Sequence, residues 1–479
     1  MKYQSHTWKG YDKSYSYKML VLFAVLAAFV MYIDIMLAPS LPSISSQYHI
    51  NSAQASLIIS LYLVFGTAII PIIGKLGDMF GKKRILIYVL IAYVSMVGVT
   101  SFASSYHILL ISRMFQGIGL SIFPLAFSLV REEFPRELVP RAQGLIAGMF
   151  GAGLSIGLVG GAYIANYFGW QANYHIGFPF IIGLTILIYL IGRESRYRDP
   201  NVKLDYLGAA WLGISLAAIV LGLSEGETWG WTSLAIVGLI VGGMLAIIPL
   251  AFVEKHRTQP ILNIKLLKHR NVLISNIMIL ATGVSMFLVF QAISYKMELP
   301  APGGFGYDIL TTGLYLLPMA VTILVLAYPL GILLSRFGIK RFLMLGALVG
   351  ALGFLLMPTA TTALGLAEYL ILAAVGIAIL QVAIQNLLVL SVDPHEMGLA
   401  TSLNTVFRNM GSGMGAPIAG SLISTFTATY IIHGIPTALP LAKAFNYSFY
   451  AGAAAFLVIF VLAFFAEEVL GKRAVKRAY

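Results

Sequence analysis

A long succession of apolar runs limits the fold of this chain more than any other feature of its sequence. A run of about 20 apolar residues is long enough to cross a bilayer as a helix. Runs of this kind occupy 19–41, 53–74, 84–102, 106–129, 143–166, 172–192, 205–223, 232–253, 271–293, 308–332, 341–358, 363–388, 399–426 and 446–469. We therefore predict an all-α integral membrane protein with fourteen transmembrane helices.

The composition excludes most water-soluble classes of protein. Hydrophobic residues make up 59% of the 479 positions and charged residues only 10%, with a mean hydropathy of +0.87. Soluble domains carry roughly 25% charged residues. The absence of cysteine excludes disulfides, thiol nucleophiles and cysteine-ligated metal sites.

The distribution of basic residues predicts the orientation of the chain. If both termini are cytoplasmic, 27 of the 31 Lys and Arg fall in inner segments, Lys296 and Lys443 fall in outer loops, and Arg113 and Arg408 lie within spans. This positive-inside bias favours an even number of spans. We expect a multi-pass protein of the plasma membrane. The net charge of +12 also fits contact with anionic lipid. A nucleic-acid partner is not expected, because the basic residues are scattered over many short loops.

Two short segments of the chain repeat each other. GKLGDMFGKKR (Gly74–Arg84) and GILLSRFGIKR (Gly331–Arg341) align without a gap, and each is a basic turn between two long apolar runs. This repeat indicates a duplicated helical bundle. Duplicated bundles in a membrane are typical of secondary transporters, whose site lies between the two repeats.

Four motifs of this sequence resemble those of one known family. The segment Gly74–Arg84 resembles the loop signature between helices 2 and 3, and RMFQGIG (Arg113–Gly119) resembles the helix 4 signature. DIMLAPSLPSI (Asp34–Ile44) resembles a helix 1 segment of the drug exporters, and GLATSLNTVFRNMGSGMG (Gly398–Gly415) resembles helix 13. The motifs stand in the order and spacing of the fourteen-helix drug:proton antiporter branch of the major facilitator superfamily, which this chain resembles over almost its whole length.

The resemblance implies two pseudo-symmetric six-helix bundles plus two inserted helices. The expected parts are an N-terminal cytoplasmic tail (1–18), a first bundle (19–192), a linker with the two extra spans (193–270), a second bundle (271–469) and a cytoplasmic tail (470–479). One segment departs from the family pattern. The helix 5 run GAGLSIGLVGG lacks the usual proline, although Gly153, Gly157 and Gly161 recur every fourth residue. We expect these glycines to serve close helix packing.

Asp34 is the one acidic residue that lies well inside a predicted span. A carboxylate within hydrocarbon is costly and marks a candidate functional site. Asp34 and Arg113 both lie about 10 Å below the outer surface, counted at 1.5 Å per residue from their helix ends. We predict that they pair and that Asp34 alternates between an arginine-paired carboxylate and a protonated acid, as a proton carrier does. A static structural ion pair is the alternative.

The first basic turn is a second candidate site. The resemblance implies that Gly74, Asp78, Gly81 and Arg84 form a conformational latch, in which charge pairing and an acidic group near a helix N-terminus hold the halves together. A merely solvated charged turn is the alternative. Ser335 replaces the acid in the second copy, so the latch is expected to be asymmetric.

A weaker set of polar, aromatic and sulfur-containing residues is expected to line a substrate cavity. Its members are Tyr32, Met36, Gln116, Phe290, Gln291, Tyr315, Gln381, Gln385, Asn404 and Arg408. Hydrogen bonding between helices is an equal alternative for the polar members, as is contact of Arg408 with Asp393 or Glu396. Most aromatic residues at such spacings face lipid or neighbouring helices, which is the alternative for the aromatic members.

The sequence favours a transporter over an enzyme. No G-x-x-x-x-G-K-[ST] loop is present, the histidines lack metal-ligand spacing, and we expect no cofactor or bound metal. The predicted function is proton-coupled export of amphipathic or hydrophobic small molecules by alternating access, by a monomer. The alternatives are proton-coupled uptake of a small solute and a membrane sensor that does not transport.

Overall fold

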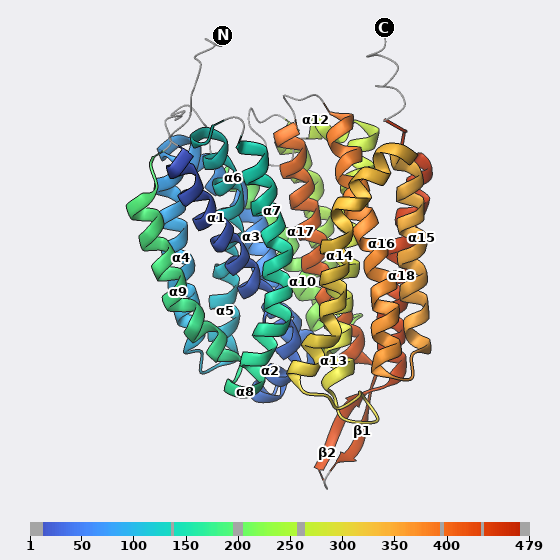
Figure 1. Ribbon diagram of the computed structural model, residues 1–479. Coiled ribbons are helices and arrows are strands. Elements are labelled where there is room, and N and C mark those ends of the chain that lie inside the picture. The colour runs from blue at the N-terminus through green and yellow to red at the C-terminus, as the bar shows by residue number, and fades with distance from the viewer. Residues whose placement is uncertain are drawn as a thin grey trace.

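The computed structural model describes residues 13–135, 138–194, 205–255, 264–392, 397–432 and 435–469, which are mostly helical. Long helices run side by side between two ends of the molecule (Figure 1). We call the end that carries the turns at Gly81 and Gly338 the basic face. The opposite end carries a protruding pair of strands, and we call it the hairpin face (Figure 1).

The first half of the chain forms helices up to residue 191. They are α1 (Lys13–Ile35), η1 (Ala38–Ser40), α2 (Leu41–Tyr48), α3 (Ser52–Phe80), α4 (Lys82–Ser101), α5 (Tyr106–Gln116), η2 (Gly117–Ser121), α6 (Ile122–Glu133), α7 (Val139–Ile156), the π-helical turn η3 (Gly157–Gly161), α8 (Ala162–Phe168) and α9 (Trp170–Ile191). Two helices follow in the predicted insert, α10 (Tyr206–Trp229) and α11 (Leu234–Lys255).

The second half begins with a short helix and ends near the C-terminus. Its elements are α12 (Ile264–Leu267), α13 (Arg270–Glu298), α14 (Ile309–Phe337), α15 (Ile339–Leu356), η4 (Met357–Thr359), α16 (Ala363–Ser391), α17 (Met397–Thr425), β1 (Thr427–Ile432), β2 (Ile435–Pro440) and α18 (Ala442–Phe465).

Eleven helical segments of the described chain are long and apolar enough to cross a bilayer. Two further apolar helical stretches, Ala152–Phe168 and Leu234–Ala246, are shorter. α17 is as long as the others but carries Asn404, Arg408 and Asn409 along its length. The chain is a multi-pass membrane protein.

The first span is longer than predicted and is broken. The apolar run predicts one helix over 19–41, whereas α1 starts at Lys13, ends at Ile35, and is followed by η1 and α2 up to Tyr48. Pro39 and Pro42 occupy the first turns of η1 and α2. Proline suits the start of a helix and cannot donate the hydrogen bond that would continue the preceding one. The break therefore falls directly after Asp34.

Two features near the hairpin face differ from the sequence expectation. The chain is not wholly helical, because β1 and β2 pair antiparallel with Thr427 opposite Pro440. The β-branched and aromatic residues of TATYII favour a strand once the apolar run of α17 has ended. Lys296, predicted in an outer loop, lies in the last turn of α13, with its ammonium 4.9 Å from the ring centroid of Phe445.

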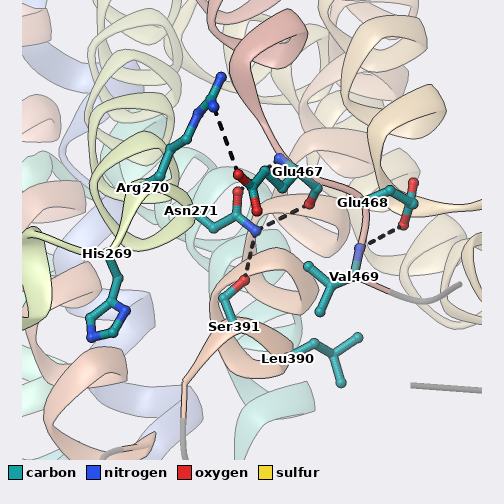
Figure 2. Close-up of a pocket in the computed structure, with 8 residues that line it drawn as sticks. All are labelled: His269, Arg270, Asn271, Leu390, Ser391, Glu467, Glu468 and Val469. Atoms are coloured by element: carbon teal, nitrogen blue, oxygen red, sulfur yellow. Dashed lines mark hydrogen bonds and ion pairs between the residues drawn. The ribbon is translucent and has the colours of Figure 1, made fainter. Parts of the chain in front are cut away.

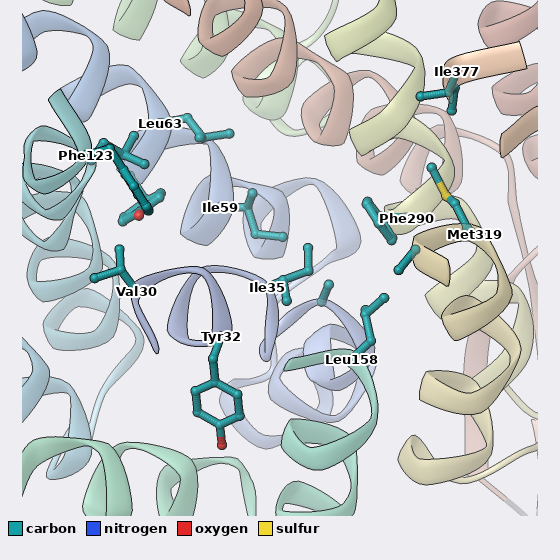
Figure 3. Close-up of a cluster of buried hydrophobic side chains, with 14 of the residues drawn as sticks. Val30, Tyr32, Ile35, Ile59, Leu63, Phe123, Leu158, Phe290, Met319 and Ile377 are labelled. Atoms are coloured by element: carbon teal, nitrogen blue, oxygen red, sulfur yellow. The ribbon is translucent and has the colours of Figure 1, made fainter. Parts of the chain in front are cut away.

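The buried core runs from the first half of the chain into the second. Figure 3 shows Ile35 and Leu158 from the first half beside Phe290 and Met319 from the second. The inserted helix α10 packs against both α3 and α17, so it lies along the seam between the halves. Its Ser224 hydroxyl lies 3.4 Å from that of Ser56 on α3.

Four hydrogen bonds join the two halves near the hairpin face. Ser52 Oγ donates to the Gly420 carbonyl at 2.8 Å, Gln291 Nε2 donates to the Ser52 carbonyl at 3.1 Å, Ser43 Oγ donates to Glu298 Oε2 at 3.2 Å, and the Ser45 and Tyr295 hydroxyls bond each other. Backbones also approach closely here, since a Cβ on Gly313 of α14 would lie 2.2 Å from the Leu158 carbonyl. The halves are therefore held together at this face.

Candidate functional site

Arg113 lies at the end of α1 and binds its last carbonyl groups. The guanidinium donates from Nη2 to the carbonyl of Asp34 at 2.8 Å and from Nη1 to the carbonyl of Ile33 at 3.3 Å. The final carbonyls of a helix have no partner within the helix, and a cation is favoured at this end of its dipole. Arg113, which is fully buried, therefore caps α1 at the break.

The Asp34 carboxylate is a looser partner of the same arginine. Its Oδ1 lies 3.5 Å from Nη2 of Arg113, and 13% of its side chain is exposed. The structure thus brings together the two residues that the depth argument paired. It adds that Arg113 stays anchored by backbone carbonyls whatever the charge on the carboxylate.

Further contacts hold Arg113 in place. Its Nη1 donates to Gln116 Oε1 at 3.0 Å, and the amide of Gln116 donates in turn to Thr100 Oγ1 and to the Met96 carbonyl. The ring of Tyr62 on α3 lies 4.4 Å from the guanidinium carbon, a cation–π distance. Gln116, predicted to line a cavity, is fully buried in this support.

The glycines of the fifth predicted span bring a helix close to α1 at Asp34. A Cβ on Gly153 would lie 2.2 Å from the Ala28 carbonyl, one on Gly157 would lie 2.4 Å from Ile35, and one on Gly161 would lie 2.6 Å from Met36. Any larger side chain would push α7 and η3 away from α1. These glycines therefore serve packing, as their spacing predicts.

Arg408 approaches Asp34 from the second half of the chain. It lies in the middle of α17, its side chain is exposed, and its charge interacts with that of Asp34. A carboxylate of the first half thus stands near two arginines, one from each half. Asp393 and Glu396, the other predicted partners of Arg408, lie outside the described residues.

Besides Gln116, five of the predicted cavity residues are buried among protein atoms. Tyr32 donates its hydroxyl to Asn173 at 2.5 Å, and Met36 packs on Gly161. Phe290 is 1% exposed, Gln291 binds the Ser52 carbonyl, and Asn404 donates to Asn276 at 3.3 Å. In contrast, Gln385 is exposed, while Gln381 and Tyr315 are half-buried. Arg408, Gln385, Gln381 and Tyr315 are thus the predicted members that keep some exposed surface.

The residues of the predicted latch contact their own half of the chain. Lys82 Nζ lies 2.9 Å from Asp78 Oδ1 and donates to Glu132 Oε1 at 2.5 Å. Gly74 has open space around it, since a Cβ there would meet nothing within 4 Å. Lys82 links the turn to the end of α6, an ion-pair network that the motif alone did not reveal.

The two copies of the basic turn share a contact that sequence reasoning missed. Gly81 (φ 105°) and Gly338 (φ 89°) each start a helix in a conformation that favours glycine. Glu194 accepts the backbone N–H groups of Lys83 and Arg84, and Glu468 accepts those of Ile339 and Lys340, at 3.0–3.2 Å. The available signal was an acidic residue after the last helix of each half.

The repeat extends to the start of the first helix in each half. In the second half, Asn271 accepts the N–H of Glu467 at 2.9 Å and donates to Ser391 at 3.0 Å (Figure 2). In the first half, the Tyr15 hydroxyl accepts the N–H of Arg193 at 2.9 Å and donates to Glu133 at 2.6 Å. Each half is therefore tied together at the basic face in the same way.

Comparison with known proteins places this arrangement in a family. Residues 23–416 match the Major Facilitator Superfamily. The chain is 26% identical over 369 residues to the multidrug transporter protein MdtP of Bacillus subtilis (strain 168), covering 76% of this chain and 67% of MdtP. It is 24% identical over 390 residues to the tetracenomycin C resistance and export protein of Streptomyces glaucescens, a match that covers 80% of this chain and 71% of that protein. Two other relatives are matched over 56% of their own length.

A solved structure shares the fold at low sequence identity. It is the crystal structure of a bacterial homologue of the human lysosomal transporter Spinster, in an inward-facing and unoccupied conformation. The TM-score is 0.68 and the identity 14%, over 95% of this chain and 97% of the other. The chain therefore belongs to the Major Facilitator Superfamily and is a multi-pass membrane transporter of small molecules.

Proposed function

We propose that this transporter is a proton-coupled exporter of amphipathic or hydrophobic small molecules. The observation that carries the proposal is the position of Asp34, at a break in α1, beside Arg113 of its own half and near Arg408 of the other. A carboxylate whose charge interacts with arginines of both halves can couple its protonation to the relative position of the halves. The names of the two relatives, a multidrug transporter and a resistance and export protein, support export.

In the proposed cycle, Asp34 changes charge while Arg113 stays fixed. Arg113 keeps its bonds to the carbonyls of Ile33 and Asp34 when the carboxylate takes up a proton. Protonation removes the attraction between Asp34 and Arg408, so the seam between the halves loses one cross-half ionic interaction. Release of the proton restores this interaction. The halves are thereby biased towards different positions in the two protonation states.

The proposed topology has fourteen spans in the plasma membrane, with both termini and the basic face in the cytoplasm. The hydrogen bonds between the halves lie near the hairpin face and support closure of this state on the outer side. The exposed side chain of Arg408, in the middle of α17, supports a water-filled opening at this depth. We propose that the transporter is a monomer. We also propose that Asp78 helps to hold the two halves together in the alternative conformation, the one closed on the cytoplasmic side.

The test replaces the carboxylate and measures transport in proteoliposomes. Asp34→Asn keeps the shape and polarity of the side chain but cannot titrate, so it should abolish substrate accumulation driven by a pH gradient. Exchange of substrate without a gradient should survive. If Asp34→Asn still builds a substrate gradient, the coupling group lies elsewhere.

Asp308→Asn is the matched control. Asp308 caps α14 by accepting the N–H of Thr311 at 3.0 Å, and asparagine is an equally good cap. The hydrogen bonds from Thr311 hold the pKa of Asp308 below its usual range, so it stays ionised at working pH. Its replacement should leave transport and its pH profile unchanged. The direction of proton-driven flux in oriented vesicles separates export from uptake.

A further inference from the structure

Four buried polar atoms around Asp34 and Arg113 make no hydrogen bond of normal geometry in the described part of the chain. They are the hydroxyls of Tyr62, Tyr93 and Tyr174 and the Nε of Arg113. Their side chains are also the four largest that are fully buried in the described part of the chain. A buried polar atom without a partner is strongly unfavourable, and natural proteins contain few of them. Four of them around one ion pair require a physical explanation.

The three tyrosines converge on the pair from three different helices. Tyr62 on α3 places its ring 4.4 Å from the guanidinium carbon of Arg113. Tyr93 on α4 packs its ring against Gly119, where a Cβ would come within 2.6 Å. Tyr174 on α9 meets Trp170 edge to face at 6.1 Å between ring centroids. All three interact electrostatically with both Arg113 and Asp34.

The protein around these tyrosines leaves their hydroxyls poorly satisfied, since only loose contacts link that of Tyr62 to Asp34 and that of Tyr174 to Arg113. The rings fill space between helices, a role that phenylalanine performs without a polar atom. Full hydrogen bonding of these hydroxyls therefore needs a further partner. Water is the partner that buried polar groups take up where the chain offers none, and it needs two to four polar atoms around it. Three hydroxyls, one N–H and the adjacent carboxylate meet this requirement.

We propose that Tyr62, Tyr93, Tyr174 and Nε of Arg113 enclose a site for ordered water that exchanges protons with Asp34. The acid form of Asp34 gives its proton to a water oxygen, and that water passes a proton on along its own hydrogen bonds. One proton leaves and one carboxylate remains, so the charges balance. The tyrosines stay neutral and act as positioning residues. This role rests on the proposed function of Asp34, whereas the water site itself does not.

The groups that face Asp34 come from five helices. Arg113 on α5 and Arg408 on α17 are the charged ones, and Tyr62 on α3, Tyr93 on α4 and Tyr174 on α9 are the titratable ones. The two arginines stay charged throughout. Water at the site therefore meets a fixed positive charge on one side and a carboxylate of variable charge on the other.

The first experiment is X-ray radiolytic labelling of the full-length protein, followed by mass spectrometry. Radiolysis of bound water makes hydroxyl radicals in place, so a buried side chain beside ordered water reacts although bulk solvent does not reach it. Tyr62, Tyr93 and Tyr174 should be labelled severalfold faster than Tyr295, which is also buried but whose hydroxyl is bound by Ser45. Labelling at the Tyr295 rate means that the site is dry and overturns the proposal.

The second experiment replaces each tyrosine with phenylalanine. If water binds there, Tyr62→Phe, Tyr93→Phe and Tyr174→Phe each leave that water short of a partner and lower the melting temperature. If the site is dry, each variant removes an unsatisfied hydroxyl and raises it. A rise in melting temperature for all three variants would also overturn the proposal.

Transport measurements then test the proton role separately. Tyr62→Phe should slow accumulation driven by a pH gradient and leave substrate exchange without a gradient at the wild-type rate. Equal slowing of both reactions would reject the proton role. If labelling shows water but Asp34→Asn still couples transport to protons, the proposed function fails while the water site stands.

Discussion

Arg113 should matter more for stability than the carboxylate it was predicted to pair with. Arg113→Met removes hydrogen bonds to the carbonyls of Ile33 and Asp34 and to Gln116, at 3.3, 2.8 and 3.0 Å. Hydrogen bonds to a charged group contribute roughly 1.5–3 kcal/mol each, and an uncompensated buried charge costs about 3–5 kcal/mol. Since the 3.3 Å bond is long, we expect a loss of about 3–5 kcal/mol in total.

Asp34→Asn should destabilise the protein clearly less than Arg113→Met does. It keeps all three of these hydrogen bonds, because two of the acceptors are backbone carbonyls and the third is Gln116. It removes the 3.5 Å contact and the attraction to Arg408, while the carbonyls and the Tyr62 ring continue to stabilise the positive charge of Arg113. We expect a loss of about 1 kcal/mol, in the range of an ordinary hydrogen bond.

Melting temperatures of the purified variants, measured by intrinsic fluorescence, decide between these expectations. The predicted order is wild type, then Asp34→Asn a little lower, then Arg113→Met far lower. Arg84→Met is the control for the loss of an arginine, because the Arg84 side chain is exposed and the hydrogen bond to Glu194 comes from its backbone N–H, which methionine keeps. If Asp34→Asn melts as low as Arg113→Met, the carboxylate rather than the helix cap holds the arginine, and the reasoning is refuted.

Three further predictions concern the faces of the molecule. Since the chain has no cysteine, single introduced cysteines report which side of the membrane they occupy. Ile431→Cys on the exposed hairpin should react with an impermeant thiol reagent in intact cells, and Lys268→Cys should react only after permeabilisation. Labelling of Lys268→Cys in intact cells would reject the topology. Glu194→Gln and Glu468→Gln should lower the melting temperature by similar amounts, about 1 kcal/mol each in free energy, because each carboxylate accepts two N–H groups at a helix start; unequal effects would contradict the symmetry of the repeat. Asp78→Asn should fold normally but transport poorly, and Asp78→Glu should lose less of the transport rate. If the asparagine variant transports at the wild-type rate, Asp78 is not a latch and its segment is only a solvated charged turn.

The sequence alone determined the features that depend on position along the chain. Apolar runs of sufficient length predict membrane helices, the repeated turns at Gly81 and Gly338 predict a duplication, and counting residues predicts that Asp34 and Arg113 lie at one depth. Each of these is a one-dimensional quantity, because a helix rises 1.5 Å per residue whatever surrounds it. For this reason the structure brings Asp34 and Arg113 together as the count predicts.

Only the tertiary structure decided which side chains meet around that pair. The helices are apolar on nearly all sides, so hydropathy does not reveal which face of a helix meets which neighbour. The partners also lie far apart in the sequence: Arg113 caps α1 about 80 residues before it, and Glu194 caps α4 about 110 residues before it. The prolines after Asp34 marked a break, but its free carbonyls acquired a partner only once α5 had packed against α1. The same packing brought Tyr62, Tyr93 and Tyr174 to one buried site.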